Sequence, residues 1–102
     1  MTDRELLEKA AKAAGLRYIK PTEDYSGIFG LTLCDEVGRH MEDWRPLTDD
    51  GDALRLAVKL RMTPHIDSNS TECSDCFEVH SGDPYAATRR AIVRAAAALA
   101  GD

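Results

Sequence analysis

The 102-residue sequence lacks any apolar run that could cross a membrane. A membrane span needs roughly 18 consecutive apolar residues, and even the alanine-rich stretch near the C-terminus is interrupted by Arg94. The first residues also lack the basic start, apolar core and small-residue cleavage site of a signal peptide. We therefore expect a cytoplasmic protein with no membrane partner.

Basic residues are in deficit. The chain has 13 Lys and Arg against 18 Asp and Glu, which gives a formal net charge of −5. Non-specific affinity for nucleic acid comes mainly from Lys and Arg that neutralise phosphates. The composition therefore argues against a general nucleic-acid binder, and we expect no direct sequence-specific contact with nucleic acid.

Aromatic residues and cysteines are also few, at 6% aromatics and three cysteines. An odd number of cysteines without an export signal predicts reduced thiols rather than a disulfide framework. The length and the 43% hydrophobic content are ordinary for a small domain with its own core. We expect one domain over residues 1–102 that needs no cofactor.

Three segments have apolar residues at the three- and four-residue spacing of amphipathic helices. The first begins at a capping box formed by Thr2 and Glu5 and ends before Gly15. The second covers about residues 50–61 behind a group of aspartates, and the third covers about 84–100 behind an Asp-Pro pair. The strongly apolar face of the second helix predicts that it is central to the core.

Between the helices, β-forming residues and turn residues predict strands. We expect short strands at 16–20 and 28–34, a loop at 35–48, and a hairpin made of 65–67 and 72–80. Trp44 in the loop should be buried. The order is helix, two strands, helix, two strands, helix, which predicts an α+β layered domain with one four-stranded, mainly antiparallel sheet covered by helices.

The sharpest chemical pattern is Cys73-Ser74-Asp75-Cys76 followed by His80. Two thiolates separated by two residues can hold one edge of a tetrahedral zinc, and Cys73, Cys76 and His80 together would supply three ligands. However, a single CxxC lacks a second ligand pair, and positions 73 and 76 of a straight strand point to opposite faces. Two reduced cysteines beside a hairpin turn explain the pattern better.

A second pattern lies on the last helix, where Arg89, Arg90 and Arg94 follow Tyr85 within a few turns. Guanidinium groups form paired hydrogen bonds to phosphate or carboxylate, and a tyrosine ring can stack on a nucleobase. These four residues are therefore a candidate site for an anion or a small nucleotide. The alternative is a solvated helix face whose arginines pair with nearby carboxylates.

Acidic side chains fall mostly in the predicted loops and strands, where they would form a negative surface suited to a basic groove on a partner protein. The candidate partner-binding residues are Glu23, Asp24, Asp35, Glu36, Glu42, Asp43, Glu72, Asp75 and Glu78. A plain solubility surface is the alternative for any one of them. No nucleophile has the sequence context of a catalytic triad, so we expect a protein that is not an enzyme.

Three stretches resemble one known family. They are ELLEKAAKAAG (5–15), WRPLTDDGDALRLAVKL (44–60) and DPYAATRRAIVRAAA (83–97). Together they cover about half the chain, and they are similar to the small phage and prophage proteins of the phage α-β-α sandwich domain family. The resemblance implies a phage or prophage gene that acts in a bacterial host cell, and it brings no catalytic residues with it. The match is poorest over 65–80, so it gives the candidate zinc site no support.

These observations lead to three hypotheses for the function. The first is a phage-encoded, non-enzymatic inhibitor of a bacterial defence system, such as an anti-CRISPR, that binds a host effector protein through its acidic surface. The second is a protein that sequesters a nucleotide signal with the arginines of the last helix, for which a homo-oligomer with sites between subunits would be suitable. The third is a small zinc-binding structural module.

Overall fold

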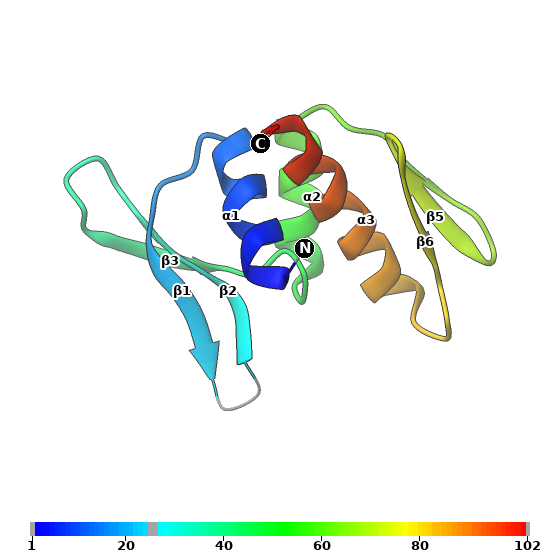
Figure 1. The fold of residues 1–102 in the computed structure, drawn as a ribbon, viewed down its shortest axis with the longest axis horizontal. Helices are drawn as coiled ribbons and strands as arrows, with labels where there is room; N and C mark the ends of the chain where they lie inside the picture. The colour runs from blue at the N-terminus through cyan, green and yellow to red at the C-terminus, as the bar shows by residue number, and fades with distance from the viewer. Residues whose placement is uncertain (1, 25–26, 102) are drawn as a thin grey trace.

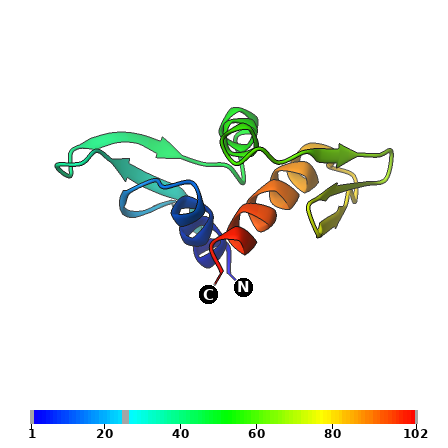
Figure 2. The ribbon, with the colours of Figure 1, turned by 90° about the horizontal axis from the view of Figure 1, so that it is seen from above.

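Within residues 2–24 and 27–101, which the computed structural model describes, three helices lie between two three-stranded sheets (Figure 1; Figure 2). The side chains of residues 23, 24, 27–29 and 40 lie outside this description. The elements in chain order are α1 (Asp3–Ala13), β1 (Tyr18–Asp24), β2 (Gly27–Cys34), β3 (His40–Trp44), α2 (Asp50–Lys59), β4 (Pro64–Ile66), β5 (Ser70–Cys73), β6 (Cys76–Val79) and α3 (Pro84–Leu99). The predicted α+β class is confirmed.

The strands do not form the single four-stranded sheet that we expected. They form two antiparallel meanders, β1-β2-β3 and β4-β5-β6, on opposite sides of the helices (Figure 1). Each meander joins consecutive strands through short connections, and α2 separates the two in sequence. Helices therefore cover one face of each sheet: α1 packs on β2, while α3 packs on β4, β5 and β6.

Two of the predicted segments were wrong, and each has a physical reason. The segment 35–48, expected as a loop, contains β3, which has too many polar residues to show an apolar pattern and is held by its pairing with β2. The expected strand 72–80 is broken at Ser74, which adopts a positive φ of 54° in the turn between β5 and β6. Trp44 is buried as predicted, at 5% exposure.

The helix boundaries follow the predicted caps. Thr2 accepts from the backbone N–H of Glu5, whose carboxylate in turn accepts from the Thr2 N–H, and Gly15 adopts the left-handed conformation just after α1. Asp49 caps α2 and Asp83 caps α3 through the same kind of bond to a backbone N–H.

The central helix is α3, not the second helix as predicted from its apolar face. It packs against α1, α2 and all three strands of the second sheet. Its small side chains make this possible, because alanines let neighbouring backbones approach on several sides, and five of them are buried together with Ile92 and Val93. On α2, by contrast, Leu54 and Val58 are exposed, and Leu99 at the end of α3 is exposed as well.

Candidate functional site

The predicted acidic surface is divided between the two sheets. Asp35 and Glu36 follow β2, and Glu42 and Asp43 are on β3, whereas Glu72, Asp75 and Glu78 belong to the β4-β5-β6 sheet on the other side of the helices. The side chains of Glu23 and Asp24 lie outside the described residues. The structure therefore does not bring the candidate residues together as one surface.

Several of these carboxylates have structural partners. Asp35 accepts hydrogen bonds from the backbone N–H groups of Val37 and Arg39 and forms an ion pair with the Arg39 side chain, and the Arg39 backbone bond is the main cause that lowers its pKa. Asp43 of β3 accepts a hydrogen bond from the Thr32 hydroxyl of the neighbouring strand β2. Asp35 and Asp43 therefore stabilise the first sheet and its turn.

The second sheet, β4-β5-β6, lies in a stretch of the chain that has acidic side chains but no Lys or Arg. Residues 62–88 contain five acidic side chains and no Lys or Arg. Glu78 forms an ion pair with Arg94 of α3. Within the described part of the chain, neither Glu72 nor Asp75 takes part in a side-chain hydrogen bond or ion pair, and both are exposed.

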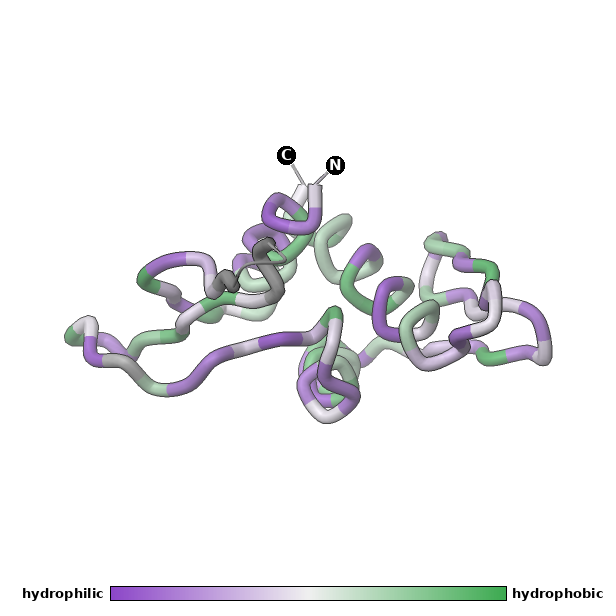
Figure 3. Tube along the Cα trace, turned by 90° about the horizontal axis from the view of Figure 1, so that it is seen from below, coloured by the Kyte–Doolittle hydropathy of each residue, from purple (hydrophilic) through white to green (hydrophobic). Residues whose placement is uncertain are grey.

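The outer face of this sheet, defined by the side chains of His65, Glu72, Phe77 and Val79, combines this charge with apolar residues. Alternate residues of a strand point to opposite faces, and in β6 Cys76 and Glu78 are half-buried while Phe77 and Val79 are 54% and 59% exposed. Phe77 pairs with Glu72, which pairs with His65, so one row of the face crosses all three strands. Hydrophobic and hydrophilic positions alternate along the sheet (Figure 3).

The hairpin geometry corrects our expectation for the two cysteines. Cys73 and Cys76 do not point to opposite faces of one strand, because the turn at Ser74 and Asp75 makes them direct partners across β5 and β6. Cys73 is fully buried, and His80 instead hydrogen-bonds through Nε2 to the Thr71 hydroxyl at 2.9 Å. The described residues contain no group of three or more side chains placed to hold a metal ion, so the candidate zinc ligands are not assembled.

The two thiols should differ in reactivity. Burial raises the pKa of the Cys73 thiol, and the neighbouring Cys76 raises it further, so less of the reactive thiolate is present. In the folded protein at pH 8 we expect iodoacetamide to modify Cys76 and to leave Cys73 unmodified, as measured by peptide mass spectrometry. Both should react in urea, and equal labelling of the two in the folded protein would contradict this result.

The four candidate anion-binding residues of α3 are divided between two pockets. Tyr85 and Arg89 line an apolar pocket of about 510 Å³ between α2, β4 and α3, while Arg90 and Arg94 line a pocket on another side of the helix. Arg89 donates to the Leu47 carbonyl at 2.9 Å and to Asp50 at 2.6 Å. Its role in this structure is to tie α3 to the N-terminal end of α2.

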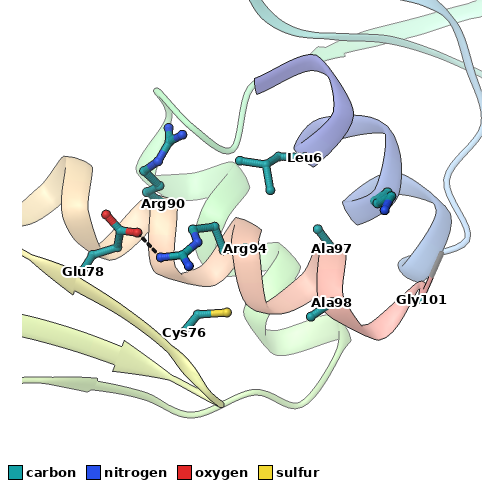
Figure 4. Close-up of a pocket in the computed structure, with 9 residues that line it drawn as sticks. Leu6, Cys76, Glu78, Arg90, Arg94, Ala97, Ala98 and Gly101 are labelled. Carbon is teal, nitrogen blue, oxygen red and sulfur yellow. Dashed lines mark hydrogen bonds and ion pairs between the residues drawn. The ribbon is translucent and has the colours of Figure 1, made fainter. Parts of the chain in front are cut away.

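The second pocket, which we call the cationic pocket, lies between α1, α3 and β6 and has a volume of about 550 Å³ (Figure 4). Its lining residues are Leu6, Lys9, Cys76, Glu78, Arg90, Arg94, Ala97, Ala98 and Gly101. The sequence pattern identified Arg90 and Arg94 but not Lys9, because no spacing rule places a residue of α1 beside α3.

Among the described helices, none is both long and apolar enough to cross a membrane.

Comparisons with known proteins show no family for this chain. No family model matches it, and no solved structure gives a significant match. A 75-residue segment, 72% of the chain, is 29% identical to 2-C-methyl-D-erythritol 2,4-cyclodiphosphate synthase from Lachnospira eligens. The chain spans only 41% of the length of that protein. The resemblance to the phage α-β-α sandwich proteins stays a prediction.

Proposed function

We propose that this protein is a phage-encoded, non-enzymatic inhibitor of a bacterial defence system, and that it binds a host effector protein through the outer face of the β4-β5-β6 sheet. The observation that supports this proposal is the composition of that face and its adjoining turn: exposed Phe77 and Val79 lie beside Glu72 on the face, and Asp75 is in the turn between β5 and β6. In the described part of the chain both carboxylates are unpaired, and the segment has no Lys or Arg. The phage origin rests on the sequence resemblance.

The chemistry of this face suits a protein partner. Protein interfaces commonly have an apolar, aromatic centre that loses its water and a polar or charged rim. Phe77 and Val79 would supply the centre, and Glu72 and Asp75 would supply the rim. A partner of complementary chemistry presents an apolar depression edged by Lys or Arg, such as the basic groove with which a nuclease effector holds nucleic acid.

The proposal is tested by charge reversal on this face and in the adjoining turn between β5 and β6. We expect expression of the wild-type protein to restore phage plating on cells that carry the susceptible defence system. The double variant Glu72→Lys, Asp75→Lys should abolish this effect and weaken binding to the purified effector at least about tenfold, because like charges across an interface cost more than about 1.4 kcal/mol.

The matched control places the same reversal on the other sheet. Glu36→Lys with Glu42→Lys changes two exposed carboxylates by the same amount of charge, and it should leave plating and effector binding unchanged. Thermal unfolding should confirm that both double variants fold. The proposal fails if the wild-type protein never changes plating on defence-positive cells, or if the control reversal removes activity as completely as the reversal on the outer face.

A further inference from the structure

The cationic pocket concentrates positive charge in a protein whose net charge is −5. Its described lining has three cationic side chains, Lys9, Arg90 and Arg94, against one carboxylate, Glu78. The cations come from two helices that are far apart in the sequence and packed against each other, α1 and α3. The lining therefore brings three cationic side chains from two helices into one concavity.

The two arginines are held in position by contacts that leave donors available. Arg94 forms an ion pair with Glu78 and donates from Nη1 to the Phe77 carbonyl at 3.2 Å, and Figure 4 shows its side chain extending from α3 toward Glu78. Arg90 donates from Nη2 to Asp3 at 3.0 Å, and Asp3 does not line the pocket. A guanidinium has five N–H groups, so both arginines can donate further bonds to a bound anion.

The rest of the lining is small or apolar. Leu6, Ala97 and Ala98 form one side, from α1 and α3. A volume of about 550 Å³ lies within the roughly 300–1,000 Å³ of small-molecule sites, which combine apolar walls with a few placed polar groups. An inorganic ion would fill only part of this space, so the pocket suits an anion that carries an organic group.

We infer that the cationic pocket binds a small organic phosphate, whose phosphate group is held by Arg90, Arg94 and Lys9 and whose organic group lies against the alanines of α3. Arginine binds phosphate in paired, charge-assisted hydrogen bonds, and both arginines keep N–H groups beyond those used in their ion pairs. This site differs from the predicted arginine strip, because it excludes Arg89 and Tyr85 and includes Lys9. Nucleoside monophosphates are one member of this ligand class.

The site is independent of the proposed partner surface. Alternate residues of β6 face opposite ways: Cys76 and Glu78 line the pocket on the helix side, while Phe77 and Val79 are exposed on the outer face. A substitution in the pocket should therefore leave phage plating unchanged, whereas one on the outer face should leave ligand binding unchanged. The two proposals can fail separately.

Isothermal titration calorimetry with AMP, glucose 6-phosphate and pyrophosphate tests the inference. We expect the folded wild-type protein to bind at least one of the two organic phosphates more tightly than pyrophosphate, with an affinity that falls as salt is added. Bound ligand should also raise the melting temperature, because it stabilises only the folded state. Arg90→Gln should weaken binding at least about tenfold, the effect of losing one charge-assisted bond to phosphate.

Two further variants keep the test decisive. Glu78→Gln removes the carboxylate of the lining while an amide oxygen can still accept from Arg94, and it should tighten binding. Arg39→Gln, at an exposed arginine that is also in an ion pair but lies in the connection between β2 and β3, should have no effect. The inference is overturned if none of the three probes binds at millimolar concentration, if only pyrophosphate binds, if Arg39→Gln weakens binding as much as Arg90→Gln, or if Glu78→Gln weakens it.

Discussion

The substitution Gly30→Ala is expected to destabilise the protein by about 3 kcal/mol or more, the upper range for overpacking a closed site. Gly30 lies in β2, where an added Cβ would overlap the carbonyl oxygen of Trp44 and approach Cγ of Arg45 to 2.7 Å. The obstructing oxygen belongs to the backbone, so no side-chain rotation can relieve the overlap. Separating the strands would weaken the Leu31–Trp44 pairing and move the buried Trp44 ring.

Urea unfolding followed by Trp44 fluorescence measures this effect, because Trp44 is the single tryptophan of the chain. Typical domains have a total stability of about 5–15 kcal/mol, so the loss should be visible as a large shift of the midpoint. Gly38→Ala is the matched control. Gly38 has open space around its Cα and a φ of +86°, so the same methyl group should cost only the backbone strain, about 1–2 kcal/mol. Equal losses in the two variants would disprove the steric argument.

Replacing Thr71 by valine is expected to cost roughly 1–3 kcal/mol for each partner that loses its hydrogen bond. Thr71 is fully buried in β5, and its hydroxyl lies 2.9 Å from His80 Nε2 and 2.8 Å from the Thr88 hydroxyl. These bonds connect β5 with the residue after β6 and with α3. Valine keeps nearly the same volume but offers no donor or acceptor, so His80 and Thr88 are left without this partner.

The exposed Thr63, next to β4, is the control for this change. Thr63→Val alters the same atoms in contact with water and should shift the free energy of unfolding by less than about 0.5 kcal/mol. Native-state hydrogen exchange gives a second measurement, because Thr71→Val should speed exchange in β5 and β6 more than in the first sheet. Uniform acceleration over both sheets, or a loss no larger than that of Thr63→Val, would show that the hydroxyl does not hold the second sheet on α3.

The helices were predictable because their signals are local. The Thr2 and Glu5 capping box and the Asp83-Pro84 start depend on residues within three positions of one another, and both are present in the structure. The strand β3 was missed because Trp44 is the only deeply buried residue among its described side chains, and its pairing with β2 reaches back along the chain. No local period distinguishes such a segment from a loop.

The sequence indicated which types of residue could form the candidate sites, but it did not indicate which of these residues lie together. Arg90 pairs with Asp3, 87 positions away, and Arg89 pairs with Asp50, 39 positions away. These pairs agree with the alternative that carboxylates neutralise the arginines of this helix. Lys9 joins Arg90 and Arg94 around one pocket only because α1 packs beside α3.

By itself the sequence determined the helices, the class of the fold and the chemical character of its surface, because capping, apolar periodicity and charge depend on neighbours along the chain. Tertiary structure decided which strands pair, that α3 rather than α2 is central, and which charges remain exposed. Glu72 and Glu78 are alike in sequence, yet one faces solvent and the other pairs with Arg94. The difference arises because alternate residues of paired strands face opposite sides, and only packing determines which side the helix covers.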